Sequence, residues 1–364
     1  MLETTALKHL SRGQKVTLVA SVATLAAAAL GKAAGAGAVA EFVIAGLALA
    51  ALAALVGQAI DQVGERLGPS ATALLQSTLG NLPELFVCLF ALSDGLDNVV
   101  RAALVGSILG NAVLVLGSAF VVGGLRHGTQ RFDPEEPRLN ASLLLLAVTA
   151  LLVPTLASEL ETPAAAHVGA LSNICALVLL AVYAATVPFY LRDRSAPLTD
   201  AAAPSEESSQ DGWPLSLSIG VLAFASLGAA LAADWFVEPL QEATKTLGLS
   251  DVFTGLVIVA IASNAVEHVV GIRFALRAKP EYAISTTLNS PLQVALLLTP
   301  VLVLLSPAVG PVRLTLVFPP LMVAALAVSS LVVTVIIYDG EYTWVEGVAL
   351  IGLYCMVAAS FWWG

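Results

Sequence analysis

Long apolar runs follow one another along almost the whole chain, with only short polar stretches between them. A transmembrane helix needs about 20 predominantly apolar residues, and the runs are of this order of length. The chain is 58% hydrophobic and 12% charged, whereas soluble domains carry about 25% charged residues. The sequence therefore predicts an all-α polytopic membrane protein in a lipid bilayer. The first run follows Lys15 without a clear cleavage site, so it is interpreted as a helix and not as a signal peptide.

Eleven apolar segments of spanning length are predicted. Their ends carry Gly, Pro or clusters of charged residues, which mark turns between helices. The segments are 15–35, 39–58, 70–93, 98–123, 139–157, 167–191, 214–235, 251–276, 282–306, 313–337 and 343–362.

The distribution of Lys and Arg predicts how these helices are oriented. With the N-terminus in the cytoplasm, twelve of the sixteen Lys and Arg residues lie on the inner side and four on the outer side. Cytoplasmic loops of membrane proteins carry such an excess of positive charge. We therefore expect a multi-pass protein of a prokaryotic cell membrane, with its N-terminus cytoplasmic and its C-terminus outside.

One long polar segment, 192–213, divides the chain. It is rich in Ser, Ala, Pro and acidic residues, a composition typical of a flexible linker, and it is interpreted as a cytoplasmic tether rather than a cation sensor. Five predicted helices precede it in a first repeat, 39–191, and five follow it in a second repeat, 214–364. Residues 1–38 then form an N-terminal segment with one extra helix outside the repeats.

The two halves carry the same polar residues at one spacing. The pairs separated by 183 residues are Asn81 and Asn264, Glu84 and Glu267, and Ser107 and Ser290. Each half has an odd number of helices, so the second half enters the membrane in the opposite orientation. Inverted repeats of this kind are typical of secondary transporters, whose binding sites lie near the middle of the membrane between the repeats.

Glu84 and Glu267 are the residues that most strongly suggest chemistry. A charged side chain at the centre of a bilayer costs at least about 2.5–3.5 kcal/mol, so two acids there need a function or a partner. Carboxylate, amide, hydroxyl and backbone oxygens suit Ca²⁺ and do not suit zinc. Gly80 and Pro83 can loosen their helix and free carbonyl oxygens. The residues expected at or around this site are Ser77, Gly80, Asn81, Glu84, Ser107, Asn111, Ser263, Asn264, Glu267, His268, Asn289, Ser290 and Gln293.

Each of these side chains also has a purely structural interpretation. Asn and Ser in membrane helices often serve only as hydrogen-bonding contacts between helices, and both interpretations stay open for Ser107, Asn111 and Gln293. The two Glu residues could be neutral, hydrogen-bonded acids. His268 could carry protons or could be a packed imidazole.

Other classes of protein fit the sequence less well. There is no basic stripe for nucleic acid, and the three Cys residues are too far apart for a disulfide framework or a zinc site. A metalloprotease would need HExxH, whereas this chain reads EHVVG from Glu267 onward. The protein is therefore not expected to be an enzyme, and no cofactor is expected. A passive channel is a separate class, in which ion flux would be uncoupled.

Two stretches resemble the α-repeats of the Ca²⁺/cation antiporter superfamily. GNLPELFVCLFAL followed by VGSILGN is similar to the first repeat, and SNAVEHVVGIRFALRAKPEYAISTTLNSPLQVALLLTP is similar to the second. The Asn-x-x-Glu-His form with a later Ser-x-x-Gln resembles the Ca²⁺/H⁺ exchanger branch, the CAX type. Ser263 and Asn289 depart from the pattern, because Gly is usual at both positions, and Pro291 is also unusual there.

This resemblance implies that Glu84 and Glu267 bind the metal and the protons, with backbone ligands near Gly80 and Ser263. It places Asn81, Asn264, Ser107, Asn111, Ser290 and Gln293 around the site. The implied partners are the transported ions, Ca²⁺ and H⁺, and a homo-oligomer stays open.

Electrostatics gives a reason for exchange. Two ionised carboxylates close together in a poorly hydrated site repel each other, and one Ca²⁺ or two protons would neutralise both. We therefore expect a Ca²⁺/H⁺ antiporter that works by alternating access. The alternative is a Na⁺/Ca²⁺ exchanger or another divalent cation/proton antiporter of the same fold. His268 favours protons, and its counterpart in the first half is Leu85.

Overall fold

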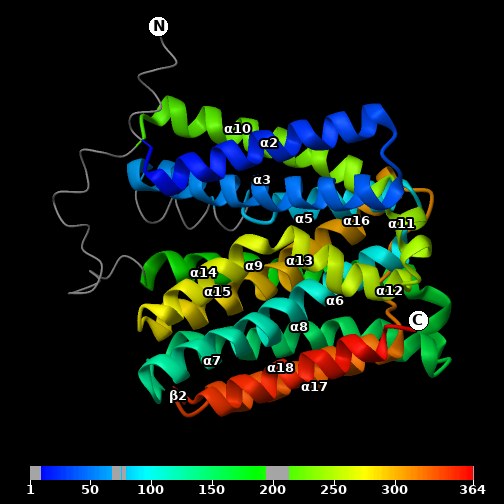
Figure 1. The fold of residues 1–364 in the computed structure, drawn as a ribbon. Helices are drawn as coiled ribbons and strands as arrows, with labels where there is room; N and C mark the ends of the chain where they lie inside the picture. Colours follow the sequence, from blue (N-terminus) through cyan, green and yellow to red (C-terminus); the bar gives the residue numbers. More distant parts are fainter. Residues whose placement is uncertain (1–9, 68–74, 76–78, 194–212, 364) are drawn as a thin grey trace, which may run out of the picture. The chain divides into compact units, whose positions relative to one another are not determined.

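A computed structural model describes residues 10–67, 75, 79–193 and 213–363, which are almost entirely helical (Figure 1). Ser77, part of the predicted segment 70–93 and most of the predicted linker lie outside the described residues. The elements are α2 (Arg12–Ala34), α3 (Ala38–Leu67), α5 (Leu82–Ser93), α6 (Asp97–Leu109), η2 (Gly110–Val115), α7 (Leu116–His127), β1 (Gln130–Arg131), α8 (Glu135–Glu159), η3 (Pro163–His167), α9 (Val168–Asp193), α10 (Leu215–Val237), α11 (Leu240–Leu247), α12 (Asp251–Phe253), η5 (Thr254–Val259), α13 (Ala260–Ser263), α14 (Ala265–Leu276), α15 (Pro280–Gln293), η6 (Val294–Leu298), α16 (Thr299–Val309), α17 (Pro320–Ile337), β2 (Glu341–Tyr342) and α18 (Trp344–Ser360).

The predicted all-α membrane architecture is confirmed. Within the described residues, eight helices are long and apolar enough to cross a membrane. A ninth candidate consists of α11 and the helix that runs from α12 to α13, which are bent by 117° relative to each other. Two shorter apolar helices, α5 and α18, lie in two further predicted segments. The count of eleven transmembrane helices stays a prediction.

The predicted segment 251–276 is not one continuous helix. It is interrupted at Asn264, whose backbone (φ −108°, ψ 19°) is not helical, so that α13 ends before it and α14 begins after it. At the break, the side chains of Ser263 and Asn264 bond to carbonyl oxygens of the preceding turn. Ser263 Oγ donates to Val259 O at 3.0 Å, and Asn264 Nδ2 donates to Ala260 O at 3.0 Å. Such local side-chain bonds compete with regular helix hydrogen bonding.

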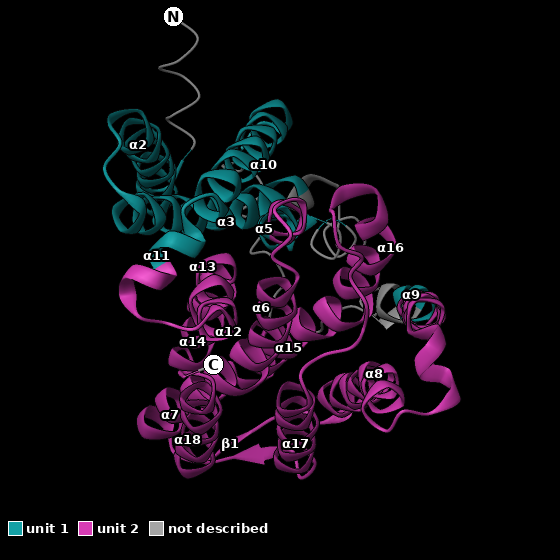
Figure 2. Ribbon diagram, turned by 90° about the vertical axis from the view of Figure 1, so that its right-hand side faces the viewer, with its two compact units in different colours: residues 1–87, 184–243 teal, residues 88–183, 244–364 magenta. Residues whose placement is uncertain are grey.

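Contacts divide the chain into two compact units, shown in different colours in Figure 2. Unit 1 comprises residues 1–87 and 184–243, and unit 2 comprises residues 88–183 and 244–364. Each unit therefore contains segments of both predicted repeats. In unit 1 the long helices α2, α3 and α10 pack side by side (Figure 1).

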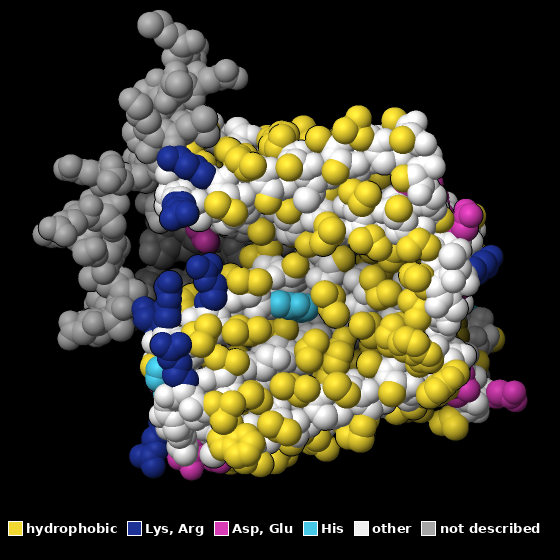
Figure 3. All heavy atoms as spheres, viewed as in Figure 1, with side chains coloured by type: hydrophobic (Ala, Val, Ile, Leu, Met, Phe, Trp, Pro, Cys, Tyr) yellow, Lys and Arg dark blue, Asp and Glu magenta, His cyan; other side chains and the backbone are white. Residues whose placement is uncertain are grey.

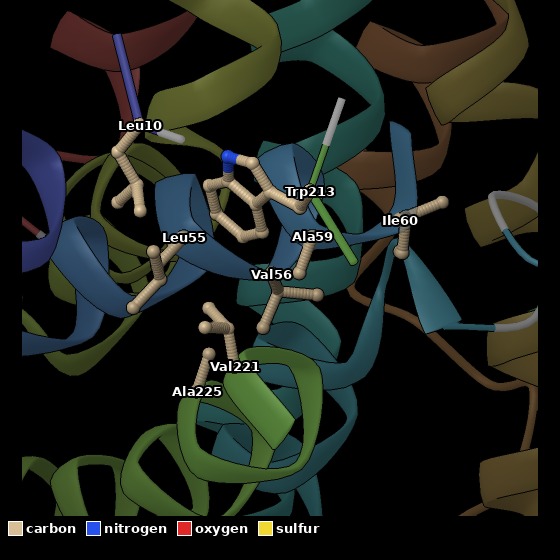
Figure 4. Packing of buried hydrophobic residues seen from close by; sticks show 8 residues of the cluster. All are labelled: Leu10, Leu55, Val56, Ala59, Ile60, Trp213, Val221 and Ala225. Atoms are coloured by element: carbon tan, nitrogen blue, oxygen red, sulfur yellow. The ribbon is translucent and has the colours of Figure 1, made fainter. Parts of the chain in front are cut away.

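Trp213 anchors the start of α10 in unit 1. Its side chain is buried against Leu10 and against residues of α3 and α10 (Figure 4). The indole Nε1 donates to Gln14 Oε1 at 3.2 Å, and the backbone N of Trp213 donates to Gln62 Oε1 at 3.0 Å. Gln14 Oε1 also accepts from the backbone N of Ser11, which completes the capping box of α2. One indole thus links the first turns of α2 and α10.

We expect Trp213→Phe to lower the free energy of unfolding by about 1–2 kcal/mol, because it removes a buried hydrogen bond and part of a buried ring. The loss can be measured by denaturant titration of the purified protein, followed by circular dichroism. Trp363→Phe is the matched control, since the side chain of Trp363 is 84% exposed. Equal losses in the two variants would contradict the assigned anchor.

In unit 2, α14 packs against α7 and α15, α6 packs against η5, and α8 and α18 pack against α17 and α7 respectively. On the face shown in Figure 3, hydrophobic side chains cover much of the surface between the two ends of the helices, and Lys and Arg side chains gather over one end of α14, α15 and α7. The two short strands pair antiparallel, Gln130 with Tyr342 and Arg131 with Glu341. They join two loops that the sequence places on the same, inner side.

Candidate functional site

The break at Asn264 places buried polar groups in the middle of an apolar stretch of unit 2. The π-helix η5 precedes α13, and Asn264 separates α13 from α14. The same local structure occurs near the predicted site in the first half, where Gly80 and Asn81 form a turn before α5. Leu85 N donates to Asn81 O at 2.9 Å, and His268 N donates to Asn264 O at 3.3 Å. Each half therefore has a helix that begins directly after an Asn residue, α5 after Asn81 and α14 after Asn264.

Buried amide and hydroxyl groups from three parts of unit 2 form one hydrogen-bonded network. These parts are the span Asp97–His127, which contains α6 and η2, the helix that is broken at Asn264, and α15. Asn264 Nδ2 donates to Ser107 Oγ of α6 at 3.0 Å. Asn111 Nδ2, from η2, donates to Asn264 Oδ1 at 3.2 Å and to Ser290 Oγ of α15 at 3.0 Å. All four side chains are buried. The structure thus brings Ser107, Asn111, Asn264 and Ser290 together, and their role in lining an ion site stays a prediction.

Two buried acceptor oxygens, one on Asn111 of the network and one on Glu267, accept no hydrogen bond from the described residues. Asn111 Oδ1 and Glu267 Oε2 are both buried and have no hydrogen-bond partner among the described residues. Glu267 lies in the first turn of α14, three residues after Asn264. Since a buried acceptor without a partner costs about 1–3 kcal/mol, and more if it is charged, these oxygens are suited to hold a cation or a proton.

The second predicted acid, Glu84, has the equivalent local position in unit 1. It lies in the first turn of α5, three residues after Asn81, and its side chain is only 3% exposed. Gly80 and Asn81, in the turn before it, are half-buried. An acid in the first turn of a helix lies where the helix dipole stabilises negative charge.

His268 lies beside Glu267 on α14 and is half-buried. A Cβ atom added to Gly110 would lie 3.9 Å from its Nε2, so Gly110 borders the imidazole. This contact places the ring next to η2, whose second residue is Asn111. Its position is compatible with a role in proton transfer, which stays a prediction.

Three other predicted residues have positions that the sequence does not reveal. The Ser263 hydroxyl is bonded to the carbonyl oxygens of Val259 and Ala260. Asn289 bonds to Asn140 of α8 and to Ser285 of its own helix, and it takes no part in the network around Asn264. Gln293 is half-buried at the end of α15, directly before η6.

Close contact between α6 and η5 holds the network together. A Cβ atom on Gly106 would lie 2.0 Å from the carbonyl oxygen of Leu256. A Cβ atom on Gly255 would lie 2.7 Å from Ala102 Cβ. Ser107 directly follows Gly106, so this crossing sets how near Ser107 comes to Asn264. Neither glycine and none of the three π-helices among the described residues was predicted from the sequence, in which a glycine in each of two apolar runs is the signal for the crossing.

Cys88, Cys175 and Cys355 are free in the structure. No group of three or more His, Cys, Asp and Glu side chains that could hold a metal ion occurs among the residues that the structure describes. The oxygen atoms found at the candidate site belong to amide, hydroxyl and carboxylate groups.

The chain is similar in sequence and in fold to known proteins. The chain is 37% identical over 339 residues to a Ca²⁺/H⁺ antiporter of Synechocystis, an alignment that covers 88% of this chain and 90% of the relative. It is 33% identical to the Ca²⁺/H⁺ antiporter ChaA of Bacillus subtilis, over 85% of this chain and 88% of the relative. The solved structure of native YfkE is similar, with a TM-score of 0.80 and 29% identity over 95% of this chain and 99% of the other.

The model of one protein family also matches most of the chain. This family is described as "Sodium/calcium exchanger protein", and its model matches residues 37–191 and 217–363. The match includes the broken helix, the buried network and both candidate carboxylates. The chain therefore belongs to the sodium/calcium exchanger protein family.

Proposed function

We propose that the protein is a secondary active transporter that exchanges Ca²⁺ for H⁺ across a membrane by alternating access. The observation that carries this proposal is the buried network of Ser107, Asn111, Asn264 and Ser290, together with the buried acceptor oxygens of Asn111 and of Glu267, three residues after Asn264. Relatives that align over most of both chains are named Ca²⁺/H⁺ antiporters, which supports these two ions as the substrates. The same support favours a transporter over an enzyme.

In this proposal Glu84 and Glu267 are the two acids that bind Ca²⁺ and protons in turn. Ca²⁺ takes 6–8 oxygen ligands, including carboxylates, amide and backbone carbonyl oxygens. Non-helical backbone near Gly80 and Ser263 would add carbonyl oxygens, with Asn81 at the first of these turns. One Ca²⁺ or two protons neutralise the pair, whereas the empty site holds two negative charges at a depth where charge is costly. The protein without a bound ion then seldom switches between the states that open to opposite sides of the membrane, and Ca²⁺ transport is therefore coupled to proton transport.

We also propose eleven transmembrane helices, arranged as one extra N-terminal helix and two inverted five-helix repeats, 39–191 and 214–364. Two features that recur 183 residues apart support this arrangement. The turn at Gly80 and Asn81 corresponds to the break at Ser263 and Asn264. The π-helix η2, at 110–115, corresponds to η6, at 294–298. π-Helical turns are rare and often lie at functional sites.

We place the N-terminus in the cytoplasm and the C-terminus outside a prokaryotic cell membrane. The pairing of β1 with β2 supports the topology, because it joins two loops that the sequence assigns to the inner side. The basic end of α7, α14 and α15 (Figure 3) supports the orientation, since cytoplasmic ends carry more Lys and Arg. Bacterial relatives support the assignment to a prokaryotic membrane.

Transport by the purified protein in proteoliposomes tests the proposed function. An imposed pH gradient is expected to drive Ca²⁺ uptake, and Ca²⁺ is expected to drive proton movement in the opposite direction. The matched control is a Na⁺ gradient of equal size at constant pH. Uptake that follows Na⁺ and ignores pH would contradict the proposal in favour of Na⁺/Ca²⁺ exchange, and Ca²⁺ flux that no counter-ion gradient affects would indicate a channel.

A further inference from the structure

A polar seam joins α8 to α15 in unit 2, outside the network around Asn264. Asn140 Nδ2 donates to Asn289 Oδ1 at 2.9 Å, and Asn289 Nδ2 donates to Ser285 Oγ at 3.3 Å. Ser285 Oγ in turn donates to Glu136 Oε1 at 2.7 Å. These four side chains, Asn140, Asn289, Ser285 and Glu136, form the seam. Asn140 is 1% exposed and Asn289 is half-buried, so the hydrogen bond between them is partly buried.

The equivalent helices of the other half have no such seam. The residues 183 positions away from Asn140, Asn289, Ser285 and Glu136 are Val323, Gly106, Ala102 and Pro319. They lie on or next to α17 and α6, which also pack against each other in unit 2. None of these four residues has a polar side chain. The two repeats therefore hold their equivalent helices by different means.

The difference follows from what each helix contacts. In the first half, Gly106 lets the backbone of α6 lie against the Leu256 carbonyl, so close packing fixes α6. In the second half, Asn289 stands at the equivalent position of α15 and bonds across to α8. A side-chain hydrogen bond replaces a backbone contact there.

The seam acts on the site through α15. Asn289 directly precedes Ser290, whose hydroxyl accepts from Asn111 at 3.0 Å. Neighbouring residues of an α-helix are fixed relative to each other at 3.6 residues per turn. A helix held at Asn289 therefore presents Ser290 to Asn111 in one rotation and at one depth.

We propose that Asn140 and Asn289 are positioning residues for ion exchange, which hold Ser290 of α15 in the hydrogen-bonded network of the site. The proposal rests on the proposed exchange function and deepens it, because it assigns the second repeat a device that the first repeat lacks. Neither residue is assigned contact with the transported ion.

Initial rates of pH-gradient-driven Ca²⁺ uptake against Ca²⁺ concentration test the seam. Asn140→Val introduces the residue found at the equivalent position, Val323, and removes the donor. We expect it to raise the KM for Ca²⁺ by about three- to tenfold, the range that the loss of one buried hydrogen bond entails, with the maximal rate much less affected. Asn140→Thr has nearly the shape of Asn140→Val but keeps a donor, so it is expected to restore most of the affinity.

A double variant and a control separate positioning from general damage. Asn140→Val combined with Asn289→Ala is expected to raise the KM no further than the worse single variant, because both remove the same contact. Ser329→Ala removes a buried hydroxyl that has no hydrogen-bond partner among the described residues, and it is expected to leave KM unchanged. If Asn140→Val does not fold, Ser285→Ala carries the same expectation for KM.

Three outcomes would overturn the proposal: equal KM values for Asn140→Val and Asn140→Thr, additive effects in the double variant, or a fall in maximal rate at constant KM. The variant Glu267→Gln is measured alongside. If it transports normally, the carboxylate site is wrong whatever the seam variants do. If it is inactive while the seam variants keep the original KM, the seam alone is refuted.

Discussion

Glu267→Gln and Glu84→Gln are each expected to reduce pH-gradient-driven Ca²⁺ uptake by roughly 100- to 5,000-fold. Removing one partner from a buried charged site costs about 3–5 kcal/mol, because the remaining charges lose their compensation. Gln keeps the size of Glu and can still accept a hydrogen bond, so the variants lose charge and proton exchange with little change in shape. Initial rates of Ca²⁺ uptake in proteoliposomes measure the effect.

Glu159→Gln is the matched control, because it makes the same chemical change at an exposed residue at the end of α8. It is expected to transport at the original rate. Near-normal uptake by either Glu267→Gln or Glu84→Gln, in protein that elutes as a single folded species, would refute the two-carboxylate site.

Competition between protons and Ca²⁺ for the same acids gives a second readout. As pH falls on the side from which Ca²⁺ binds, protons occupy the carboxylates more often, and the apparent KM for Ca²⁺ is expected to rise. The maximal rate at saturating Ca²⁺ is expected to change less, since Ca²⁺ then displaces the protons. A KM for Ca²⁺ that does not depend on pH would contradict a shared site.

The apolar runs predicted most of the fold, because in a bilayer each span must satisfy its own backbone hydrogen bonds as a helix. The predicted segment 139–157 lies within α8, Glu135–Glu159, and the predicted segment 15–35 nearly coincides with α2, Arg12–Ala34. The spacing of Asn, Glu and Ser also selected residues that the structure brings together, such as Ser107 and Asn264.

Local hydrogen bonds and contacts between helices determine the features that could not be predicted from the sequence. Hydropathy predicts one helix over residues 251–276, whereas the side chains of Ser263 and Asn264 bond to backbone carbonyls at the break, which competes with regular helix hydrogen bonding. A polar residue in an apolar run is expected to face a site, yet Asn289 bonds to Asn140 on α8. Its partner lies 149 positions away in sequence, and no periodicity within a single helix identifies such a contact.

Gly106→Ala is expected to be the most damaging single methyl addition in the described part of unit 2. The new Cβ would lie 2.0 Å from Leu256 O and 2.5 Å from Leu256 C, which are backbone atoms of η5. Neither can move by rotating a side chain, so α6 and η5 must separate. Overpacking of this kind costs about 3 kcal/mol, and we expect a similar loss in the free energy of unfolding.

Separation of α6 from η5 would directly change the geometry of the site. Ser107 Oγ accepts from Asn264 Nδ2 at 3.0 Å, and a displacement of 1 Å carries this pair beyond hydrogen-bonding distance. Asn264 would also lose alignment with Asn111, so we expect Gly106→Ala to reduce Ca²⁺ uptake by about 100-fold even in the fraction that remains folded.

Gly352→Ala provides the matched comparison, since it adds the same methyl group to another helix of unit 2, α18, where a Cβ would meet no atom within 4 Å. Alanine favours a helix by up to about 1 kcal/mol over glycine, so this variant is expected to keep both stability and transport. If Gly106→Ala instead transports Ca²⁺ as well as Gly352→Ala does, then contact between α6 and η5 does not set the geometry of the site. In that case the hydrogen bond between Ser107 and Asn264 would not hold the broken helix in position. The contacts of α15, including the seam, would then have to fix the geometry of the site.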